Sequence, residues 1–422
     1  MKTPLCLAAL SLTFAATAAD WAQWRGPNRD GHSPASIAAL PKEPKTLWSI
    51  PVGNGQASPI VAGGKLIYLD ELPGKDGQPG QEVAHAVDLK TGKELWHVAV
   101  GESEAFSNAY GTGPRCTPLV DGDRVYTQTC RGEFRCLALA DGKILWQTSF
   151  DKDWDAPFFG NSSNAPEAKE TASRRHGNNG SPVIDGDRIF VAVGSPTKGT
   201  LVAFDKKTGK VLWTTGKENT AYTSLMVATL AGTRQVVHLT ADSLIGVDVA
   251  NGKILWQTPV TSQAKRHVLT PVLADNSVTI SSTSVGLTKF SVLKDSGGFK
   301  VEPAWKNDKI KITLATPVLV NGHLYGLGTG AKTAFICVDF KTGEVKWSQP
   351  GFNDYAAVIA VGDKLLVQDM NGTMSLLKAS PEKFEELGRI QVCGNTWSHP
   401  ALADGKIYQR DKKQLFALEI GK

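Results

Sequence analysis

The sequence has few of the features that mark several common classes of protein. Only 6 of its 422 residues are cysteine and none is adjacent to another, which argues against a dense disulfide scaffold. The formal net charge is only +5, so no strongly charged partner such as nucleic acid is expected. Beyond the N-terminal segment no apolar run is long enough for a membrane-spanning helix.

Sequence motifs of several enzyme classes are absent as well. There is no Gly-x-Ser-x-Gly segment, phosphate-binding loop or dinucleotide fingerprint. The 8 histidines are scattered, and no Cys/His spacing indicates a zinc site. We therefore expect no bound metal.

The N-terminal residues have the pattern of a secretory signal peptide. Lys2 is followed by an apolar run that ends near Ala16 and by small residues before Asp20. We predict that residues 1–19 form this signal and that the mature protein is soluble and exported, either to a bacterial periplasm or out of the cell. Cys6 lies too early in the segment to be a lipid-anchor site.

Export permits disulfide bonds, and one pair of cysteines is placed for one. Cys130 and Cys136 flank the segment RGEFR, which has the composition of a hairpin turn. Cross-strand disulfide geometry is restrictive, so the sequence leaves open whether the two are joined.

What the chain does contain is a repeat. Tryptophan (11) outnumbers tyrosine (7), and five of the tryptophans end a recurring segment with a small residue, usually an acid, a polar-Gly turn and an alternating strand. The clearest copies are AVDLKTGKELW (86–96), CLALADGKILW (136–146), AFDKKTGKVLW (203–213), GVDVANGKILW (246–256) and CVDFKTGEVKW (337–347).

A second element precedes each copy. It is Ser/Thr-Pro followed by an apolar strand and a Gly turn, as in SPIVAGGKLIY (58–68) and TPLVDGDRVY (117–126). Counting two copies without the proline, eight such openings occur. Each unit then contains four short strands with period-2 alternation, which form one antiparallel sheet. Such a sheet cannot bury both faces alone, whereas several packed around an axis can, which defines a β-propeller.

The two ends of the chain indicate how the ring closes. The last unit stops near Lys422 before its tryptophan strand, and the missing strand is TLWSI (46–50) at the other end. We predict an all-β, eight-bladed propeller over residues 46–422, closed by this N-terminal strand in the last blade. Seven blades are the alternative if the weak unit at 356–392 is not a blade.

The repeat resembles that of the pyrroloquinoline quinone (PQQ) type propellers. Their superfamily includes quinoprotein alcohol dehydrogenases and the propeller protein of the outer-membrane assembly machinery. The resemblance implies that each repeat tryptophan packs between blades, with its indole N–H bonded to backbone. The residues at this structural position are Trp48, Trp96, Trp146, Trp213, Trp256, Trp305 and Trp347.

The links that enter the inner strands of a propeller surround its central funnel, so polar residues there are ligand candidates. The cations outnumber the acids, which favours an anionic or carbonyl-rich ligand; a solvated rim that binds nothing is the alternative. The candidates are Arg115, Arg175, His176, Asn179, Tyr222, Arg266, His267, Lys311, Tyr355, Trp397 and His399.

The resemblance also sets requirements for an enzyme. Quinoprotein dehydrogenases hold PQQ over a tryptophan floor, in many members beneath a disulfide between adjacent cysteines, with Ca²⁺ held by acidic and amide side chains and an Asp as base. This chain has no Cys-Cys pair, and neither Trp397 nor Asp354 stands in a matching motif. We therefore expect no cofactor and a monomeric, non-catalytic binding or scaffold propeller, which uses the funnel face and the insertions of blades 1–3 for a ligand or protein partner. The alternative is a PQQ- and Ca²⁺-dependent dehydrogenase that oxidises an alcohol or sugar.

Residues 20–45 precede the first strand and are too short for a domain. They begin with WAQWRGPNRDG, and we expect Trp21 and Trp24 to pin this arm to the outside of the propeller near Arg25. A role in binding a partner is the alternative for the arm.

Overall fold

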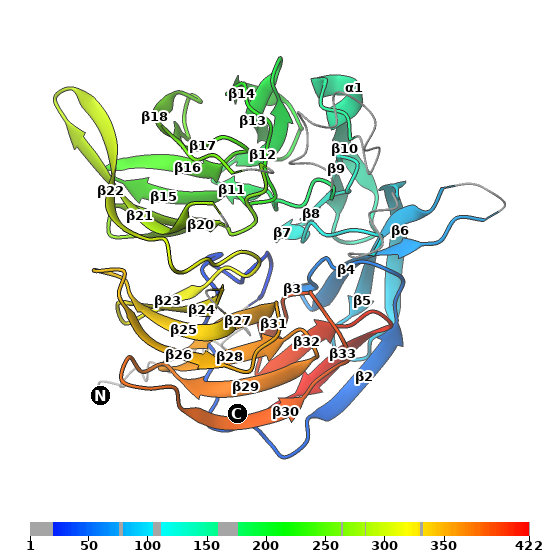
Figure 1. Cartoon of the computed structure of the whole chain (residues 1–422). Helices are drawn as coiled ribbons and strands as arrows, with labels where there is room; N and C mark the ends of the chain where they lie inside the picture. The colour runs from blue at the N-terminus through cyan, green and yellow to red at the C-terminus, as the bar shows by residue number, and fades with distance from the viewer. Residues whose placement is uncertain are drawn as a thin grey trace, which may run out of the picture.

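The computed structural model describes residues 20–75, 79–103, 111–158, 176–262, 265–282, 284–329 and 332–421. Eight sheets surround a central axis in chain order (Figure 1). The proposed signal peptide, residues 1–19, lies outside the described part of the chain.

Each of the first four blades is an antiparallel sheet whose short first strand is innermost. Blade 1 contains β3 (Ile60–Ala62), β4 (Lys65–Leu72), β5 (Gln81–Asp88) and β6 (Glu94–Glu102). Blade 2 contains β7 (Leu119–Asp121), β8 (Arg124–Gln128), β9 (Glu133–Ala138) and β10 (Ile144–Ser149), followed by the short helix α1 (Phe150–Trp154). Blade 3 contains β11 (Val183–Asp185), β12 (Arg188–Ser195), β13 (Gly199–Asp205) and β14 (Val211–Thr215). Blade 4 contains β15 (Met226–Leu230), β16 (Thr233–Leu239), β17 (Ser243–Asp248) and β18 (Ile254–Pro259).

The remaining four blades have the same plan, and the last one is completed from the other end of the chain. Blade 5 contains β19 (Val272–Ala274), β20 (Ser277–Ser282), β21 (Gly286–Asp295) and β22 (Gly298–Asn307). Blade 6 contains β23 (Val318–Val320), β24 (His323–Thr329), β25 (Thr333–Asp339) and β26 (Val345–Pro350). Blade 7 contains β27 (Ala356–Val361), β28 (Lys364–Asp369), β29 (Thr373–Lys378) and β30 (Glu386–Gln391). Blade 8 contains β31 (Ala401–Ala403), β32 (Lys406–Arg410), β33 (Gln414–Glu419) and the N-terminal β2 (Lys45–Pro51).

The structure confirms eight blades and the predicted closure. The weak unit over β27–β30 is a full four-stranded sheet, which removes the seven-bladed alternative. Strand β2 pairs antiparallel with β33, with Trp48 opposite Ala417, so both ends of the chain share one blade. This pairing covers an outer edge of β33 that would otherwise be open.

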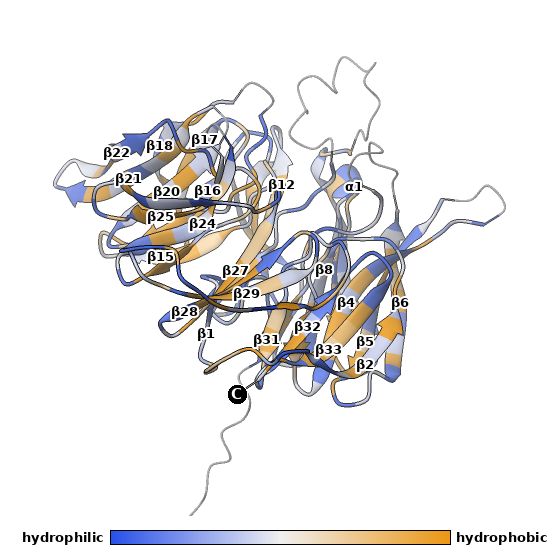
Figure 2. Ribbon diagram, turned by 60° about the horizontal axis from the view of Figure 1, so that its bottom comes forward, coloured by the Kyte–Doolittle hydropathy of each residue, from blue (hydrophilic) through white to orange (hydrophobic). Residues whose placement is uncertain are grey.

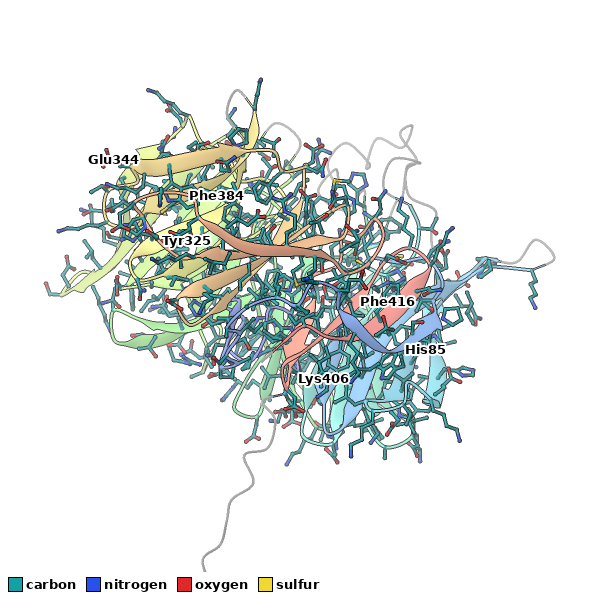
Figure 3. All side chains as sticks on the ribbon, turned by 90° about the horizontal axis from the view of Figure 1, so that it is seen from below. His85, Tyr325, Glu344, Phe384, Lys406 and Phe416 are labelled. Carbon is teal, nitrogen blue, oxygen red and sulfur yellow. The ribbon has the colours of Figure 1, made fainter. Side chains whose placement is uncertain are left out.

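The hydrophobic core lies within and between the blades. Figure 2 shows apolar residues concentrated along the strands of the sheets. Tyr325 on β24 and Phe384, both labelled in Figure 3, contact the same indole, that of Trp347, from blades 6 and 7. Each blade thus buries its faces against its neighbours, as the repeat predicts.

The repeat tryptophans join neighbouring blades. The indole nitrogens of Trp48, Trp96 and Trp213 donate to the carbonyls of Leu89, Leu139 and Val249 of the next blade, at 3.0, 3.1 and 3.2 Å. The turn glycine of the repeat lies on the ring, because a Cβ atom at Gly92 would stand only 2.8 Å from the Trp48 indole. A side chain there would separate the blades, which explains the Gly-Trp pairing of the motif.

Trp256 departs from this pattern. Its indole donates to Oε1 of Gln235 in its own blade at 2.6 Å. Blade 5 has the long hairpin β21–β22 in place of the polar-Gly turn whose neighbouring carbonyl accepts the indole proton elsewhere. Tertiary context therefore decides the partner of this one tryptophan.

The N-terminal arm does not lie on the outside of the propeller, so that expectation is wrong. Trp21 forms a bridge to Val61 on the inner strand of blade 1, and β1 (His32–Ser33) pairs in parallel with the inner strand β27 of blade 7. Trp21 is only 2% exposed. The arm runs across the axis, because Arg29 donates to backbone carbonyls at the starts of blades 3 and 4 while β1 pairs with blade 7 on the other side of the ring. The inner strand of a blade has one edge whose backbone N–H and C=O groups are not paired within the blade. The arm forms hydrogen bonds with some of these groups.

Cys130 and Cys136 are not joined by a disulfide. The hairpin register places Cys136 opposite Tyr126 on β8, while Cys130 lies in the turn beyond Gln128. The two residues are therefore not cross-strand partners, which is why the pairing left open by the sequence does not form. No helix among the described residues is long and apolar enough to cross a membrane.

Candidate functional site

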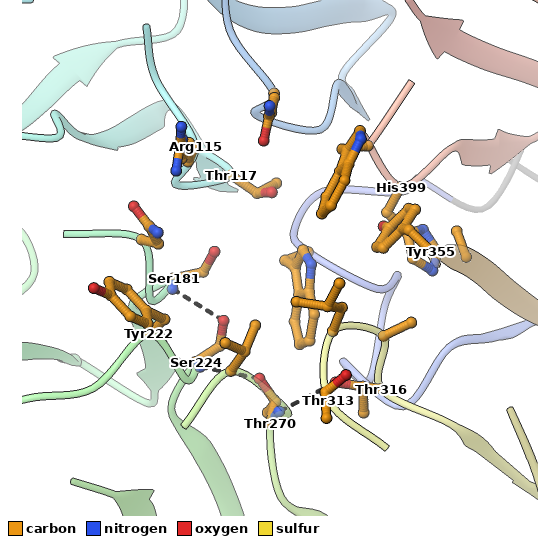
Figure 4. Close-up of a pocket in the computed structure, with 18 of the residues that line it drawn as sticks. Arg115, Thr117, Ser181, Tyr222, Ser224, Thr270, Thr313, Thr316, Tyr355 and His399 are labelled. Carbon is orange, nitrogen blue, oxygen red and sulfur yellow. Dashed lines mark hydrogen bonds between the residues drawn. The ribbon is translucent and has the colours of Figure 1, made fainter. Parts of the chain in front are cut away.

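A cavity of about 560 Å³ lies at the centre of the ring, at the entrance to the inner strands. Figure 4 shows its lining side chains converging from the links of many blades. Its walls carry residues of the Ser/Thr-Pro openings and of the longer links, together with two residues of the N-terminal arm. The cavity is large enough for a small organic ligand.

The Ser/Thr residues of the openings link the blades around this cavity. The backbone N–H of Ser181 donates to Oγ of Ser224, that of Ser224 to Oγ1 of Thr270, and that of Thr270 to Oγ1 of Thr316, at 3.0, 3.0 and 3.1 Å (Figure 4). The N–H of His399 donates in the same way to Oγ of Ser58 at 2.9 Å. The hydroxyl of the motif is thus a fixed interblade acceptor, a role that the sequence pattern alone did not show.

The arm supplies a part of the cavity that sequence reasoning missed. Trp24 and Arg25 line it, and the Arg25 guanidinium lies 5.5 Å from the centre of the Trp24 ring. Nη2 of Arg25 donates to the carbonyl of Pro317 at 2.7 Å. Burial lowers the pKa of Arg25 to about 10, which leaves the group charged at neutral pH. The arm therefore brings a fixed cation and an aromatic face to the centre of the ring.

Two aromatic pairs stand at the wall of the cavity. Tyr355 and Trp397 stack at 5.6 Å between ring centres with an interplanar angle of 13°. His176 and Tyr222 are tilted against each other at 5.9 Å. Burial raises the pKa of the Tyr355 phenol, so this group stays neutral at ordinary pH. The stacked pair offers a flat apolar surface beside the cationic groups.

The structure brings most of the predicted site residues together. Those that line the cavity are Arg115, His176, Asn179, Tyr222, Arg266, Tyr355, Trp397 and His399.

Two predicted residues are not part of the described lining, and a third lies outside the described residues. His267 is buried behind the wall, with Nε2 3.0 Å from the carbonyl of Val260. Lys311 pairs through its backbone with Thr329 and is not among the residues that line the cavity. Arg175 lies outside the described residues. The position of a residue in a link between blades predicted most of the lining residues. It did not predict which side chain of a link points into the cavity.

His399 lines the cavity but does not add to its positive charge. Its ring stacks on Trp21 of the arm at 6.2 Å, and Nδ1 lies 2.9 Å from the carbonyl of Pro400. Burial, with the neighbouring Arg25 charge, lowers the pKa of His399 to about 4. The imidazole is therefore neutral at physiological pH, and the positive charge of the described lining comes from Arg25, Arg115 and Arg266.

Buried histidines predict a loss of stability in acid. His238 on β16 has Nε2 3.0 Å from Oγ1 of Thr220, and burial lowers its pKa to about 3. In the unfolded chain a histidine takes up its proton near pH 6.5, so between pH 6.5 and 3 the unfolded state binds the extra proton. The free energy of unfolding should therefore fall as the pH falls through this window, by up to about 1.4 kcal/mol per pH unit for His238.

Urea unfolding between pH 7 and 4.5 measures this effect. The slope of unfolding free energy against pH should be smaller in His238→Gln than in the wild type, whatever the absolute stability of the variant. Equal slopes would show that His238 titrates normally in the folded protein.

The described lining of the cavity does not fit a PQQ–Ca²⁺ centre. It contains arginines and aromatic rings that suit a planar anion, but no aspartate or glutamate among its described residues. Ca²⁺ takes oxygen ligands and is held largely by carboxylates. Asp354, the candidate base, is exposed, lies outside this lining and accepts from Thr333 Oγ1 at 3.5 Å. The arginines and aromatic rings of the described lining could hold a planar anionic quinone, but these residues include no carboxylate to hold its Ca²⁺ ion.

The fold and the cavity define a class: an eight-bladed propeller of PQQ-like type with a cationic, aromatic central site. Within it, the chain belongs to the family described as outer membrane protein assembly factor BamB, whose profile matches residues 79–349.

Three known proteins match shorter parts of the chain. Lupanine 17-hydroxylase (cytochrome c) from a Pseudomonas species is 29% identical over 213 residues, which cover 47% of this chain and 26% of that protein. Outer membrane protein assembly factor BamB of Salmonella typhimurium is 28% identical over 111 residues, covering 25% and 26%. Polyvinylalcohol dehydrogenase of a Sphingopyxis species is 27% identical over 158 residues, covering 32% and 23%. The chain thus spans about a quarter of the length of each of these relatives.

Solved structures support the fold. The crystal structure of BamB from Moraxella catarrhalis has a TM-score of 0.58 at 13% identity, covering 89% of this chain and all of that one (100%). The computationally designed Ika8 protein has a TM-score of 0.56 at 10% identity, covering 89% and 99%. At such identities the likeness concerns the arrangement of the blades alone.

Proposed function

We propose that this chain is an exported, non-catalytic binding propeller that holds an anionic ligand with a flat unsaturated part in its central cavity. The observation that carries the proposal is the composition of the described lining. Arg25, Arg115 and Arg266 line the cavity together with a stacked aromatic pair, and no carboxylate is present among the described lining residues. Cations attract and orient an anion, while aromatic faces accept a planar group.

The rigidity of the site supports binding over chemistry. The Ser/Thr hydroxyls that begin the inner strands are already engaged in hydrogen bonds between blades. The Ser224 hydroxyl, for example, accepts from the backbone N–H of Ser181. His399 is held between Trp21 and the Pro400 carbonyl and is neutral. A general base near the cavity is what a dehydrogenase requires, and the described lining offers no carboxylate for that role.

A PQQ-dependent dehydrogenase is the second candidate function. It is favoured by the names of two of the matching proteins, a hydroxylase and a dehydrogenase. A scaffold role with a protein partner is compatible with the binding proposal, and the assembly-factor relative supports it. Export to the periplasm or beyond the cell rests on the signal-like pattern of residues 1–19.

Fluorescence titration with 8-anilinonaphthalene-1-sulfonate, an anionic aromatic probe, tests the binding proposal. The wild type should bind one probe saturably, and Arg115→Gln combined with Arg266→Gln should weaken binding at least about tenfold, since each charge-assisted contact contributes about 1.5 kcal/mol or more. Trp397→Ala should weaken it similarly through loss of the stacked surface. Arg389→Gln, which removes an exposed arginine paired with Glu386 on β30, is the matched control and should bind as the wild type does.

Two outcomes would count against the proposal. Equal affinity for the probe in the wild type and the double arginine variant would place the binding elsewhere. Reduction of a dye by an alcohol after addition of PQQ and Ca²⁺ would instead favour the dehydrogenase.

A further inference from the structure

A second group of ligating side chains lies away from the central cavity, on the two outer strands of blade 1. His85 on β5, which Figure 3 labels, stands directly opposite His97 on β6. Glu94 begins β6. One ring nitrogen of each histidine and one carboxylate oxygen of Glu94 all lie within 4.8 Å of one another. Among the residues that the structure describes, this is the one group of three histidine, cysteine or acidic side chains so arranged.

A β-bulge brings the three side chains to one face of the sheet. Glu94 pairs with Val87 while Trp96 pairs with Ala86, so Leu95 is an extra residue in β6. In a regular strand, residues three apart point to opposite faces, but the extra residue turns Glu94 to the face of His97. The same bulge recurs at the tryptophan strands of other blades, whereas only this blade places two histidines beside it.

The ligand atoms converge on one point. Nδ1 of His85 lies 3.1 Å from Oε2 of Glu94, and Nδ1 of His97 lies 2.8 Å from Oε1 of the same carboxylate. Two imidazole nitrogens and one carboxylate facing each other are a ligand set for a tetrahedral metal site with one open position. The side chains of Glu94 and His97 are 48% and 57% exposed, so water has access to that position.

A second layer of contacts fixes His85 in the orientation that such a site needs. Nε2 of His85 lies 2.9 Å from Oδ1 of Asp70 on β4, and the Tyr68 ring stacks on the imidazole at 4.6 Å with an angle of 4°. The other oxygen of Asp70 accepts from the N–H of Gly53 at 2.7 Å. With Nε2 donating to Asp70, Nδ1 faces the Glu94 carboxylate, and two acceptor atoms meet there unless a proton or a cation lies between them. A carboxylate behind a histidine is the usual support of a zinc ligand.

We propose that His85, Glu94 and His97 bind one Zn²⁺ ion on the outer face of blade 1, with Asp70 as the positioning residue. Two nitrogen ligands and one oxygen select zinc over calcium or magnesium, which prefer oxygen ligands alone. The ion would tie the outermost strand of the blade to its neighbour, and its fourth position would be taken by water. This site is independent of the proposed function of the cavity.

Zinc titration of the tag-free mature chain, treated with chelator and monitored with a competing fluorescent chelator, tests the site. We expect one saturable Zn²⁺ per chain and a rise of the melting temperature in its presence. His97→Gln changes an exposed ligand and should weaken binding at least a hundredfold without loss of the folded circular-dichroism spectrum. Asp70→Asn should weaken it 10–100-fold by freeing the His85 ring.

His323→Gln is the matched control, because His323 on β24 also stands beside a carboxylate, with Nε2 4.0 Å from Asp339, but has no second histidine opposite it. It should leave zinc affinity unchanged. Absence of saturable one-to-one binding, or wild-type affinity in folded His97→Gln, would overturn the site. Wild-type affinity in Asp70→Asn would overturn the positioning role. Competition by excess Mg²⁺ or Ca²⁺ as effective as that by Co²⁺ would overturn the assignment to zinc.

Discussion

Arg29→Ala is expected to lower the free energy of unfolding by about 3 kcal/mol, because it removes three hydrogen bonds from a buried charged group to backbone carbonyls. Arg29 is 3% exposed and lies where the arm crosses the axis. Its guanidinium donates to the carbonyls of Pro182, Leu225 and Ser181, at 2.8, 3.1 and 3.1 Å. These carbonyls belong to blades 3 and 4, so one side chain ties the arm to two blades.

The charge of Arg29 makes this effect larger than that of an ordinary surface residue. Burial lowers its pKa to about 9, so the group is still protonated at neutral pH and its hydrogen bonds are charge-assisted. Among the described residues, Arg29 donates to three backbone carbonyls and to Oε1 of Gln23 and to no carboxylate, so these neutral acceptors replace the water that the charge has lost.

Urea unfolding followed by tryptophan fluorescence measures the change. Arg389→Ala, at an exposed arginine paired with Glu386, is the control and should cost less than about 1 kcal/mol. A stability of Arg29→Ala within about 0.5 kcal/mol of the wild type would show that the arm does not hold the inner strands together.

Trp96→Ala is expected to be at least as damaging, with a loss of about 3–5 kcal/mol. Trp96 is only 8% exposed, and its ring packs against Gly142 of blade 2 while its indole nitrogen donates to Leu139 of the same blade. The substitution removes a large buried ring and opens a gap between two blades.

Trp96→Phe separates packing from hydrogen bonding. It keeps most of the ring and should cost about 1 kcal/mol, the usual contribution of one hydrogen bond. Leu95→Ala is the control on the same strand, since Leu95 is 48% exposed, and it should change stability by less than about 0.5 kcal/mol. A loss for Trp96→Ala no larger than that of the control would mean that the blades do not depend on this contact.

The two substitutions test features that differ in how far the sequence revealed them. The structural role of the repeat tryptophan follows from the sequence, since five copies end in the same turn and the same Trp and must therefore place it in equivalent positions. The role of Arg29 does not follow from any pattern, because its carbonyl partners lie 152, 153 and 196 residues away along the chain. The same holds for Trp24 and Arg25, which reach the central cavity only because the arm crosses the axis.

The group formed by His85, Glu94 and His97 could not be predicted from the sequence either. His85 and His97 are separated by a turn and two half-strands, so no ligand spacing of a known motif joins them. Their pairing depends on the register of β5 and β6, and the contribution of Glu94 depends on a bulge. A pattern of residue types along the chain does not report the register of a hairpin.

The sequence by itself determined the all-β class, the closure by residues 46–50 and the position of the structural tryptophans, and it favoured eight blades while leaving seven as the alternative. It could do so because a blade is a local unit, in which each strand pairs with its neighbour in the chain, and the repeat records that unit eight times. Only the tertiary structure decided the path of the arm, the inward or outward direction of each link residue, the neutral state of His399 and the pairing of the two histidines of blade 1. These depend on contacts between segments far apart in the chain and on burial, which no local pattern encodes.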